Sequence, residues 1–312
     1  MTVTRSDLES HIARVKREVV DPRAGIYGPE SFSWRLDKES IVFLGGGKAA
    51  LLQLAHPFVA HAIDQHSKTR SDPLGRFQRT FENVFAIVFG DWDSAERSAR
   101  RVHAIHSRIV GEISEDVGAF RKGDRYDAND ERALLWVHAT LLHSAVEVYE
   151  LVLGPLSATD KAGYYEESKR FARLFGISDD VLPQSWDAFS DYFSGMLESD
   201  EIHVGKPARE IAAFLFAAPR RGLTPLFHWL RSVTSGLMPP RLRQEFGLPW
   251  DRSDQHIYRA SVTTLRHTYK RLPKRLRYLP AYVRAQRRIR GIDAPDRLGE
   301  LLERIATSPL RT

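Results

Sequence analysis

The stretch KAALLQLAHPFVAHAIDQHS, residues 48–67, is apolar nearly all round. A helix with apolar residues on every side is buried among other elements, because no face of it favours water. Pro57 lies inside this stretch, and a proline within a helix bends or divides it. The sequence therefore predicts a buried, central helical segment in two parts.

The segments on either side of this stretch are also patterned as helices. The first, residues 7–20, places Leu8, Ile12 and Val15 on one face. Further helices are expected at residues 72–89, 91–113, 129–153, 157–175, 183–198, 207–217, 225–235, 254–272 and 297–306. No segment alternates polar and apolar residues for long, and no linker is evident. The sequence predicts an all-α fold, a single large helical domain over residues 1–312.

Composition bounds the classes of protein that the chain can belong to. Its 312 residues are 42% hydrophobic and 28% charged, which is ordinary for a globular domain. The first twenty residues are rich in charge and lack the apolar core of a secretion signal, so we expect a cytoplasmic protein. Cysteine is absent, which excludes disulfides, iron–sulfur clusters and thiolate-ligated haem. Any metal is left to the twelve histidines or to carboxylates.

The net charge of +6 is unevenly spread along the chain. Eleven lysines and arginines and no acidic residue lie between Asp254 and Asp293. This basic C-terminal segment, about residues 255–312, interleaves leucines with its cations. Such runs are mostly solvated faces, and the alternative is peripheral contact with an anionic membrane. We expect no nucleic-acid partner, because no recognition motif accompanies the charge.

The glycine-rich stretch GGGKAALLQ, residues 45–53, invites comparison with phosphate-binding loops. It lacks the spacing of a Walker A motif and that of the dinucleotide fingerprint. We expect instead a glycine turn that lets the following helix pack closely against its neighbours.

One histidine interrupts the apolar stripe of the helix expected at 91–113. The stripe consists of Trp92, Ala95, Ala99, Val102, His106, Ile109 and Ile113. His103 falls on its flank. A buried imidazole needs a hydrogen-bond partner or a metal, and the pattern by itself favours a hydrogen-bonded core histidine. Zinc is not indicated, because no second pair of ligands converges and no HExxH motif occurs.

The helix expected at 72–89 carries an apolar face beside a polar line. Phe77, Phe81 and Phe85 belong to the apolar face and are expected to line a pocket. The polar line consists of Arg76, Thr80 and Asn83, with Arg79 on the same side. Such cations commonly pair with carboxylates of neighbouring helices, and they also suit an anionic cofactor such as one with propionate groups.

Five motifs, in order, resemble one family of oxygenase domains. They are GGGKAALLQLAHPFVAHAIDQHS, DPLGRFQRT, Phe89-Gly90, RVHAIHSRIVG and YDANDERALLWVHATL, and GLMPPRLRQEFGLPW fits the family's C-terminal stretch. This is the family shared by latex-clearing rubber oxygenases and MpaB-type oxygenases. The resemblance spans about residues 25–250. It implies an all-helical fold that encloses haem b.

The resemblance also implies roles for particular residues. The proximal histidine that ligates the iron matches His106, and the arginine and threonine near the haem match Arg76 and Thr80. Phe77 is expected beside the cofactor. A distal lysine of some rubber oxygenases matches Arg79, and their proposed acidic base has no glutamate to match, only His61 and Asp64 nearby. We expect Arg79, His61 and Asp64 to act as distal catalytic groups.

The departures from the rubber oxygenases, together with the lack of a secretion signal, make an extracellular polymer an unsuitable substrate. The expected function is a haem-dependent oxygenase or peroxidase-like enzyme that acts with dioxygen or peroxide on an apolar small molecule or lipid. The alternatives are a haem-binding carrier or sensor without turnover, and a helical interaction protein that has lost the cofactor. Gln53, His56 and His138 recur in the family, and for them we expect packing and helix hydrogen bonds.

Overall fold

A computed structural model describes residues 1–66 and 73–292 of the chain, and the side chains of residues 1–66 and 80–292. Within these ranges the protein is helical apart from one short hairpin, which confirms the all-α prediction. The α-helices are α1 (Arg5–Glu18), α2 (Phe32–Asp37), α3 (Gly46–Leu54), α4 (Pro57–His66), α5 (Pro73–Val88), α6 (Trp92–His106), α7 (Glu131–Leu153), α8 (Ala158–Leu174), α9 (Trp186–Glu198), α10 (Lys206–Leu215), α11 (Thr224–Leu237), α12 (Pro240–Glu245), α13 (Arg252–Thr268), α14 (Lys274–Arg277) and α15 (Pro280–Ile289). The 3-10 helices are η1 (Ser40–Gly45), η3 (Arg221–Leu223) and η4 (Tyr269–Arg271), and the strands are β1 (Val110–Glu112) and β2 (Arg125–Asp127). The helix expected at 297–306 lies outside the described residues.

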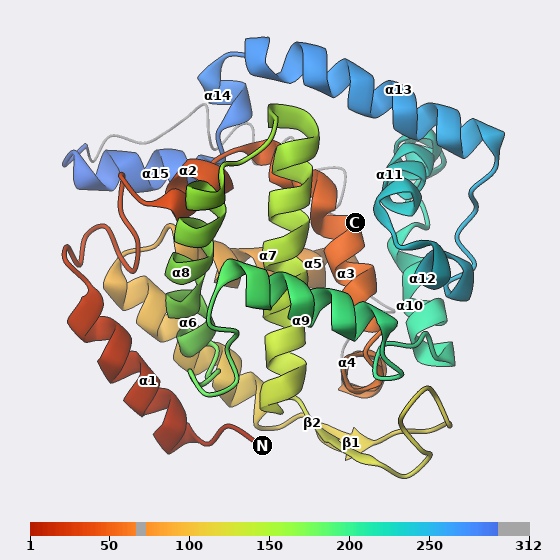
Figure 1. Ribbon diagram of the computed structural model, residues 1–312, viewed down its shortest axis with the longest axis horizontal. Helices are drawn as coiled ribbons and strands as arrows, with labels where there is room; N and C mark the ends of the chain where they lie inside the picture. Colours follow the sequence, from red (N-terminus) through yellow and green to blue (C-terminus); the bar gives the residue numbers. More distant parts are fainter. Residues whose placement is uncertain (67–72, 293–312) are drawn as a thin grey trace.

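The helix α7 forms the centre of the fold. Figure 1 shows it between α8 and α3, with α9 in front of it and α13 across the top. It begins where the Asp130 carboxylate accepts hydrogen bonds from the backbone N–H groups of Arg132 and Ala133, both at 3.0 Å. It ends at Gly154, whose positive φ of 98° favours glycine. Buried side chains lie on several of its faces, as expected for a helix enclosed by others.

The predicted two-part apolar segment is the pair α3 and α4. Pro57 opens α4 and thereby divides the segment, as predicted. The first part packs against α7, where the indole N–H of Trp136 donates to the backbone oxygen of Leu52 at 2.8 Å. The segment therefore lies in the interior, beside the central helix.

The glycine turn before α3 serves close packing, which confirms that prediction. A Cβ atom on Gly45 would lie 2.9 Å from the backbone oxygen of Ser144, closer than real Cβ atoms approach. Lys48, which a phosphate loop would turn toward a ligand, is buried and forms an ion pair with Glu147. Residues of this stretch therefore pack closely against α7 and form an ion pair with it.

The helix expected at 91–113 is shorter than predicted, and this part of the prediction is wrong. Helix α6 ends at His106, and residues 110–112 form β1, which pairs antiparallel with β2. Ile109 accepts a hydrogen bond from Ala128, and the N–H of Ile113 donates to Asp124. The backbone therefore pairs in a hairpin although the apolar residues have helical spacing. A strand of three residues is too short for an alternation of polar and apolar residues to be recognised in the sequence. His106 is the last helical residue rather than the middle of a stripe.

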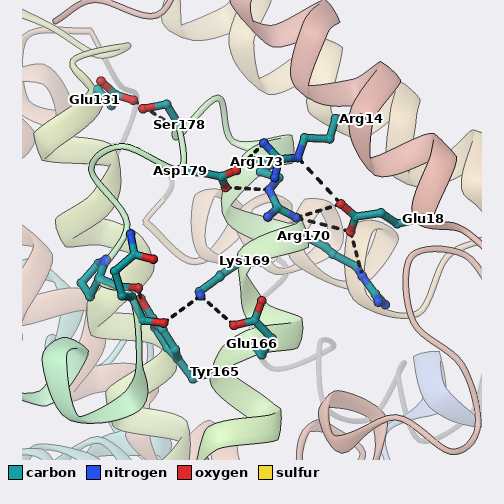
Figure 2. Close-up of polar contacts among 12 residues, drawn as sticks. Arg14, Glu18, Glu131, Tyr165, Glu166, Lys169, Arg170, Arg173, Ser178 and Asp179 are labelled. Atoms are coloured by element: carbon teal, nitrogen blue, oxygen red, sulfur yellow. Dashed lines mark hydrogen bonds and ion pairs between the residues drawn. The ribbon is translucent and has the colours of Figure 1, made fainter.

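Ion pairs fasten α1 to α8 and to the loop after α8 (Figure 2). Arg173 donates to Asp179 at 2.8 Å and to Glu18 at 3.2 Å, and Arg170 donates to Glu18 at 3.3 Å. Arg14 forms an ion pair with Asp179. Only 10% of the Arg173 side chain is exposed, so its charge depends on these partners.

The basic C-terminal segment is partly fastened to the body of the protein. Arg277 forms an ion pair of 2.6 Å with the buried Glu39, and Arg288 donates to the backbone oxygen of Phe89 at 2.8 Å. In the parts of the chain that the structure describes, no helix combines the length and the apolar character needed to cross a bilayer.

Candidate functional site

An apolar cavity of about 120 Å³ lies beside the central helix. Its walls come from α2, η1, α5, α7 and α8, segments that are far apart in the sequence. Most of the surface is contributed by apolar side chains, and the polar groups are few and placed separately. Such a cavity suits an apolar ligand that is oriented by a small number of hydrogen bonds.

Three phenylalanines form one wall of the cavity. The ring of Phe43 lies 4.7 Å from that of Phe81 and 5.4 Å from that of Phe85, between ring centroids. These rings meet at tilted angles, an arrangement that aromatic quadrupoles favour. Phe81 and Phe85 thus line a pocket as predicted. The side chain of Phe77, named with them, lies outside the described residues.

A carboxyl group and a phenol face each other at another part of the wall. The hydroxyl of Tyr164, on α8, donates to Oδ1 of Asp37, the last residue of α2, at 2.7 Å. Burial raises the pKa of Asp37 to about 7, and the charge of Glu167 adds to this rise, while the Tyr164 hydrogen bond opposes it. Burial also raises the pKa of Tyr164 well above its usual value. The pair can therefore hold a proton near neutral pH.

His138 lines the cavity from α7 with an unsatisfied ring nitrogen. Its side chain is 3% exposed, and Nε2 has no hydrogen-bond partner among the residues that the structure describes. The ring stacks on Phe171, with 5.8 Å between centroids. Burial lowers the pKa of His138 to about 4, so the imidazole is neutral at physiological pH. Ser144 lies further along α7, and its buried Oγ likewise has no partner among the described residues.

Packing was expected for three family-pattern residues, and the structure separates them. Gln53 donates to Thr140 Oγ1 at 3.1 Å, and His56 Nδ1 accepts from the backbone N–H of Phe58 at 3.2 Å. These two follow the prediction. His138 also packs, with its ring on Phe171, but it lines the cavity and its Nε2 has no hydrogen-bond partner among the described residues. The sequence around His138 does not predict that this residue lines a cavity, because the cavity is formed by residues of α5, α7 and α8 together.

His106 lies apart from the cavity, at the C-terminal end of α6, and its side chain is partly buried. Its neighbour His103 is engaged elsewhere, with Nε2 3.1 Å from the backbone oxygen of Val3. Ser98 on α6 donates to Asn83 Oδ1 on α5 at 3.1 Å. Since α5 and α6 join at Gly90, positions 76 and 106 both lie at the ends of these helices remote from the turn.

The residues expected on α5 fall largely outside the described side chains. This applies to Arg76, Phe77 and Arg79, for which only the helical backbone is given. Thr80 is exposed and makes further contacts within the protein.

His61 and Asp64 lie on α4, next to the hairpin rather than in the cavity. Both ring nitrogens of His61 have partners, the backbone oxygen of Pro57 at 2.9 Å and Ser114 Oγ at 3.1 Å. Burial raises the pKa of Tyr126, on β2, to about 12, and the charge of Asp64 contributes to this rise. Because β1 starts four residues after His106, the hairpin connects the neighbourhood of α4 to the end of α6.

His106 would offer a haem iron one imidazole ligand. Among the described residues, no group of three or more His, Cys, Asp or Glu side chains could hold a metal ion. A haem needs only one or two axial ligands from the protein, because the porphyrin supplies the rest. A histidine at position 106, on the same end of a helix pair as an arginine position, is chemically compatible with a haem.

Comparison with known proteins identifies what the chain is similar to. The family described as "ER-bound oxygenase mpaB/B'/Rubber oxygenase, catalytic domain" matches residues 34–267. Uncharacterised proteins of Mycobacterium bovis and Mycobacterium tuberculosis are each 26% identical over 234 residues, covering 72% of this chain and 88% of theirs. No solved structure matches the chain.

Proposed function

Because the chain belongs to the catalytic-domain family of the ER-bound MpaB-type and rubber oxygenases, we propose that it is a haem b-dependent oxygenase or peroxidase-like oxidoreductase. Its substrate is an apolar small molecule or a lipid. The observation that carries this proposal is the cavity beside α7, with its phenylalanine wall and its few buried polar groups. A binding space of this character fits an apolar substrate.

His106 is the residue that would hold the iron. It lies at the end of α6 with a partly buried side chain. Arg76, on the same end of α5, would pair with a propionate, and Thr80 and Phe77 would lie beside it. The haem, when bound, supplies the iron at which dioxygen or peroxide reacts.

His61, Asp64 and Arg79 are proposed to handle protons and to orient the oxidant. His61 Nδ1 donates to the backbone oxygen of Pro57, so Nε2 of the neutral ring accepts the 3.1 Å hydrogen bond from the Ser114 hydroxyl. A ligand that took the place of Ser114 could therefore give a proton to Nε2. Arg79 would contribute a fixed positive charge to an anionic oxidant.

Turnover tests this proposal against the carrier and the interaction protein. Protein with bound haem is incubated with dioxygen, or with peroxide, and an extract of apolar lipids, and the products are compared by mass spectrometry with a haem-only control. We expect oxygenated products that depend on the protein. Recovery of unaltered lipid from haem-loaded protein would support a carrier instead, and a colourless protein that takes up no haem would support the interaction protein.

We also propose peripheral contact with an anionic membrane on the cytoplasmic side. Residues 270–276, KRLPKRL, are exposed throughout and run from η4 into α14. Leu272 is 41% exposed and Leu276 is 53% exposed, among four cations. Exposed leucines flanked by lysine and arginine suit a surface of anionic lipids, which attracts the cations and admits the leucines. Such contact would bring a lipid substrate to the protein.

A further inference from the structure

The cavity extends along the central helix. Its lining residues on α7 run from His138 to Ala145. Seven steps along a helix, from residue 138 to residue 145, correspond to about 10 Å along its axis. The three phenylalanine rings of η1 and α5 line the same cavity. A molecule bound there is therefore elongated and mostly apolar.

His138 supplies a hydrogen-bonding atom that the protein leaves unused. Buried polar atoms in folded proteins are nearly always paired, because an unpaired one costs free energy. Nε2 of His138 is buried and unpaired among the described residues. Ser168, which also lines the cavity, is the contrast, since its hydroxyl donates to the backbone oxygen of Tyr165 at 2.6 Å. The unpaired Nε2 of His138 is therefore the atom to which we expect a polar group of a ligand to hydrogen-bond.

The cavity favours an uncharged polar group over a charged one. None of its described lining residues is lysine or arginine, and its acidic residue is Asp37. A ligand carboxylate would have no cation to pair with and would be repelled by an ionised Asp37. An ammonium group would be desolvated beside a carboxyl that burial keeps about half protonated at pH 7. A neutral imidazole, in contrast, pairs with a hydroxyl in either tautomer.

We propose that this cavity is the substrate site and that it takes an elongated apolar molecule whose one uncharged hydroxyl or carbonyl group hydrogen-bonds to Nε2 of His138. The inference rests on the proposed oxygenase for what becomes of the bound molecule. The binding itself needs only the residues of the cavity. His138 is thus a substrate-binding residue, and α7 positions it.

Calorimetric titration with three eight-carbon probes tests the proposal on the purified protein without added haem. The probes are 1-octanol, octanoate and octylamine, which share a chain and differ in the charge of the end group. We expect 1-octanol to bind at pH 7 and the two charged probes to bind at least tenfold more weakly. Equal or tighter binding of octanoate or octylamine, or no binding of 1-octanol, would overturn the proposal.

Three variants assign the effect to His138. His138→Phe keeps the stacking on Phe171 and removes the ring nitrogen, so 1-octanol should bind roughly tenfold more weakly, the worth of one hydrogen bond. His138→Gln restores a polar group and should recover part of the affinity. Ser168→Ala, the matched control, removes a hydroxyl that is already satisfied and should leave binding unchanged. Unchanged affinity in His138→Phe would contradict the assignment, as would an equal loss in Ser168→Ala. If His138→Phe does not fold, His138→Gln and the probe series decide.

The outcome is separable from that of the proposed function. Failure to bind haem, together with selective binding of 1-octanol, would remove the oxygenase and leave the cavity site in place. Binding of haem without selective binding of 1-octanol would remove the proposed cavity site and leave the proposed oxygenase in place.

Discussion

Tyr164 donates a hydrogen bond of 2.7 Å to Asp37 across the wall of the cavity, although 127 residues separate them in the sequence. This contact gives the Asp37 carboxyl group a hydrogen-bond partner in the wall of a mostly apolar cavity. The consequence is a carboxyl group that titrates near neutral pH rather than near pH 4. It makes both the stability of the fold and the character of the cavity depend on pH.

The Asp37→Asn variant should remove a pH-dependent loss of stability. The pKa of Asp37 is about 7 in the folded protein and about 4 in the unfolded chain. Between these values the folded state keeps a proton that the unfolded state releases, so Asp37 lowers the free energy of unfolding as pH rises from about 4 to 7. The free energy of unfolding of Asp37→Asn, relative to that of wild type, should therefore rise by about 3 kcal/mol between pH 4 and pH 8.

Urea unfolding at a series of pH values measures this difference. Asp180→Asn changes an exposed carboxylate and serves as the control, with the same pH profile as wild type. A constant difference between Asp37→Asn and wild type at every pH would contradict the shifted pKa.

His143 should make the fold sensitive to acid. Burial lowers its pKa to about 3, and the charges of Lys48 and Lys161 add to this, while its ring stacks on Phe193 at 3.9 Å between centroids. The unfolded chain takes up a proton near pH 6.5 that the folded protein refuses, so stability falls as pH drops from 6.5 toward 3. His143→Phe keeps an aromatic ring for the stacking. Between pH 7 and pH 4 its free energy of unfolding should fall by about 3 kcal/mol less than that of wild type.

Thermal unfolding at pH 7 and pH 4 follows this effect. The matched control is His256→Phe, a change at an exposed histidine of α13, which should track wild type at both values. Equal acid sensitivity in His143→Phe and wild type would show that His143 does not carry the penalty.

Arg173 should matter more to stability than its neighbour Arg14. Its side chain is 10% exposed and bridges Glu18 and Asp179, whereas that of Arg14 is 51% exposed. Removing a buried charge leaves its partners under-compensated. We expect Arg173→Met to lower the free energy of unfolding by about 2–3 kcal/mol and Arg14→Met by less than about 1 kcal/mol, as urea unfolding can measure. Similar losses in the two variants would mean that burial does not set the strength of these pairs.

The KRLPKRL surface should bind anionic vesicles in a salt-dependent way. Lys274→Glu with Arg275→Glu should abolish co-sedimentation with phosphatidylserine vesicles at low salt, because it reverses the local charge. Binding by wild type should weaken at high salt. Arg108→Glu with Arg125→Glu changes two exposed arginines near the hairpin, which lies at the opposite end of the molecule from α14 (Figure 1), and should leave binding intact. Equal loss in both double variants would indicate only a general charge effect.

The sequence predicted most helices because each has a local signal. Asp130 and Ser157 cap their helices, Pro57 divides α3 from α4, and Gly154 ends α7. The stripe of α6 was correct as far as Ala95 and Ala99, which are buried, but Ile109 and Ile113 are held by hairpin pairing. That pairing depends on residues 124–128, which a helical period cannot register.

The cavity was only partly predictable. Phe81 and Phe85 belong to an amphipathic helix, so their inward direction follows from spacing alone. Asp37, Tyr164 and His138 come from three different helices, and no spacing relates them. Their meeting is a result of tertiary packing, and so are the shifted pKa values of Asp37 and His138.

The absorption spectrum of the protein reconstituted with haemin, compared between wild type and His106→Ala, tests the central claim most directly. We predict a Soret band in wild type that is abolished or shifted in His106→Ala. It should be retained in His103→Ala, because His103 is engaged with Val3 instead. A wild-type protein that does not change the haemin spectrum, or a His106→Ala spectrum identical to that of wild type, would contradict His106 as the ligand of a haem iron.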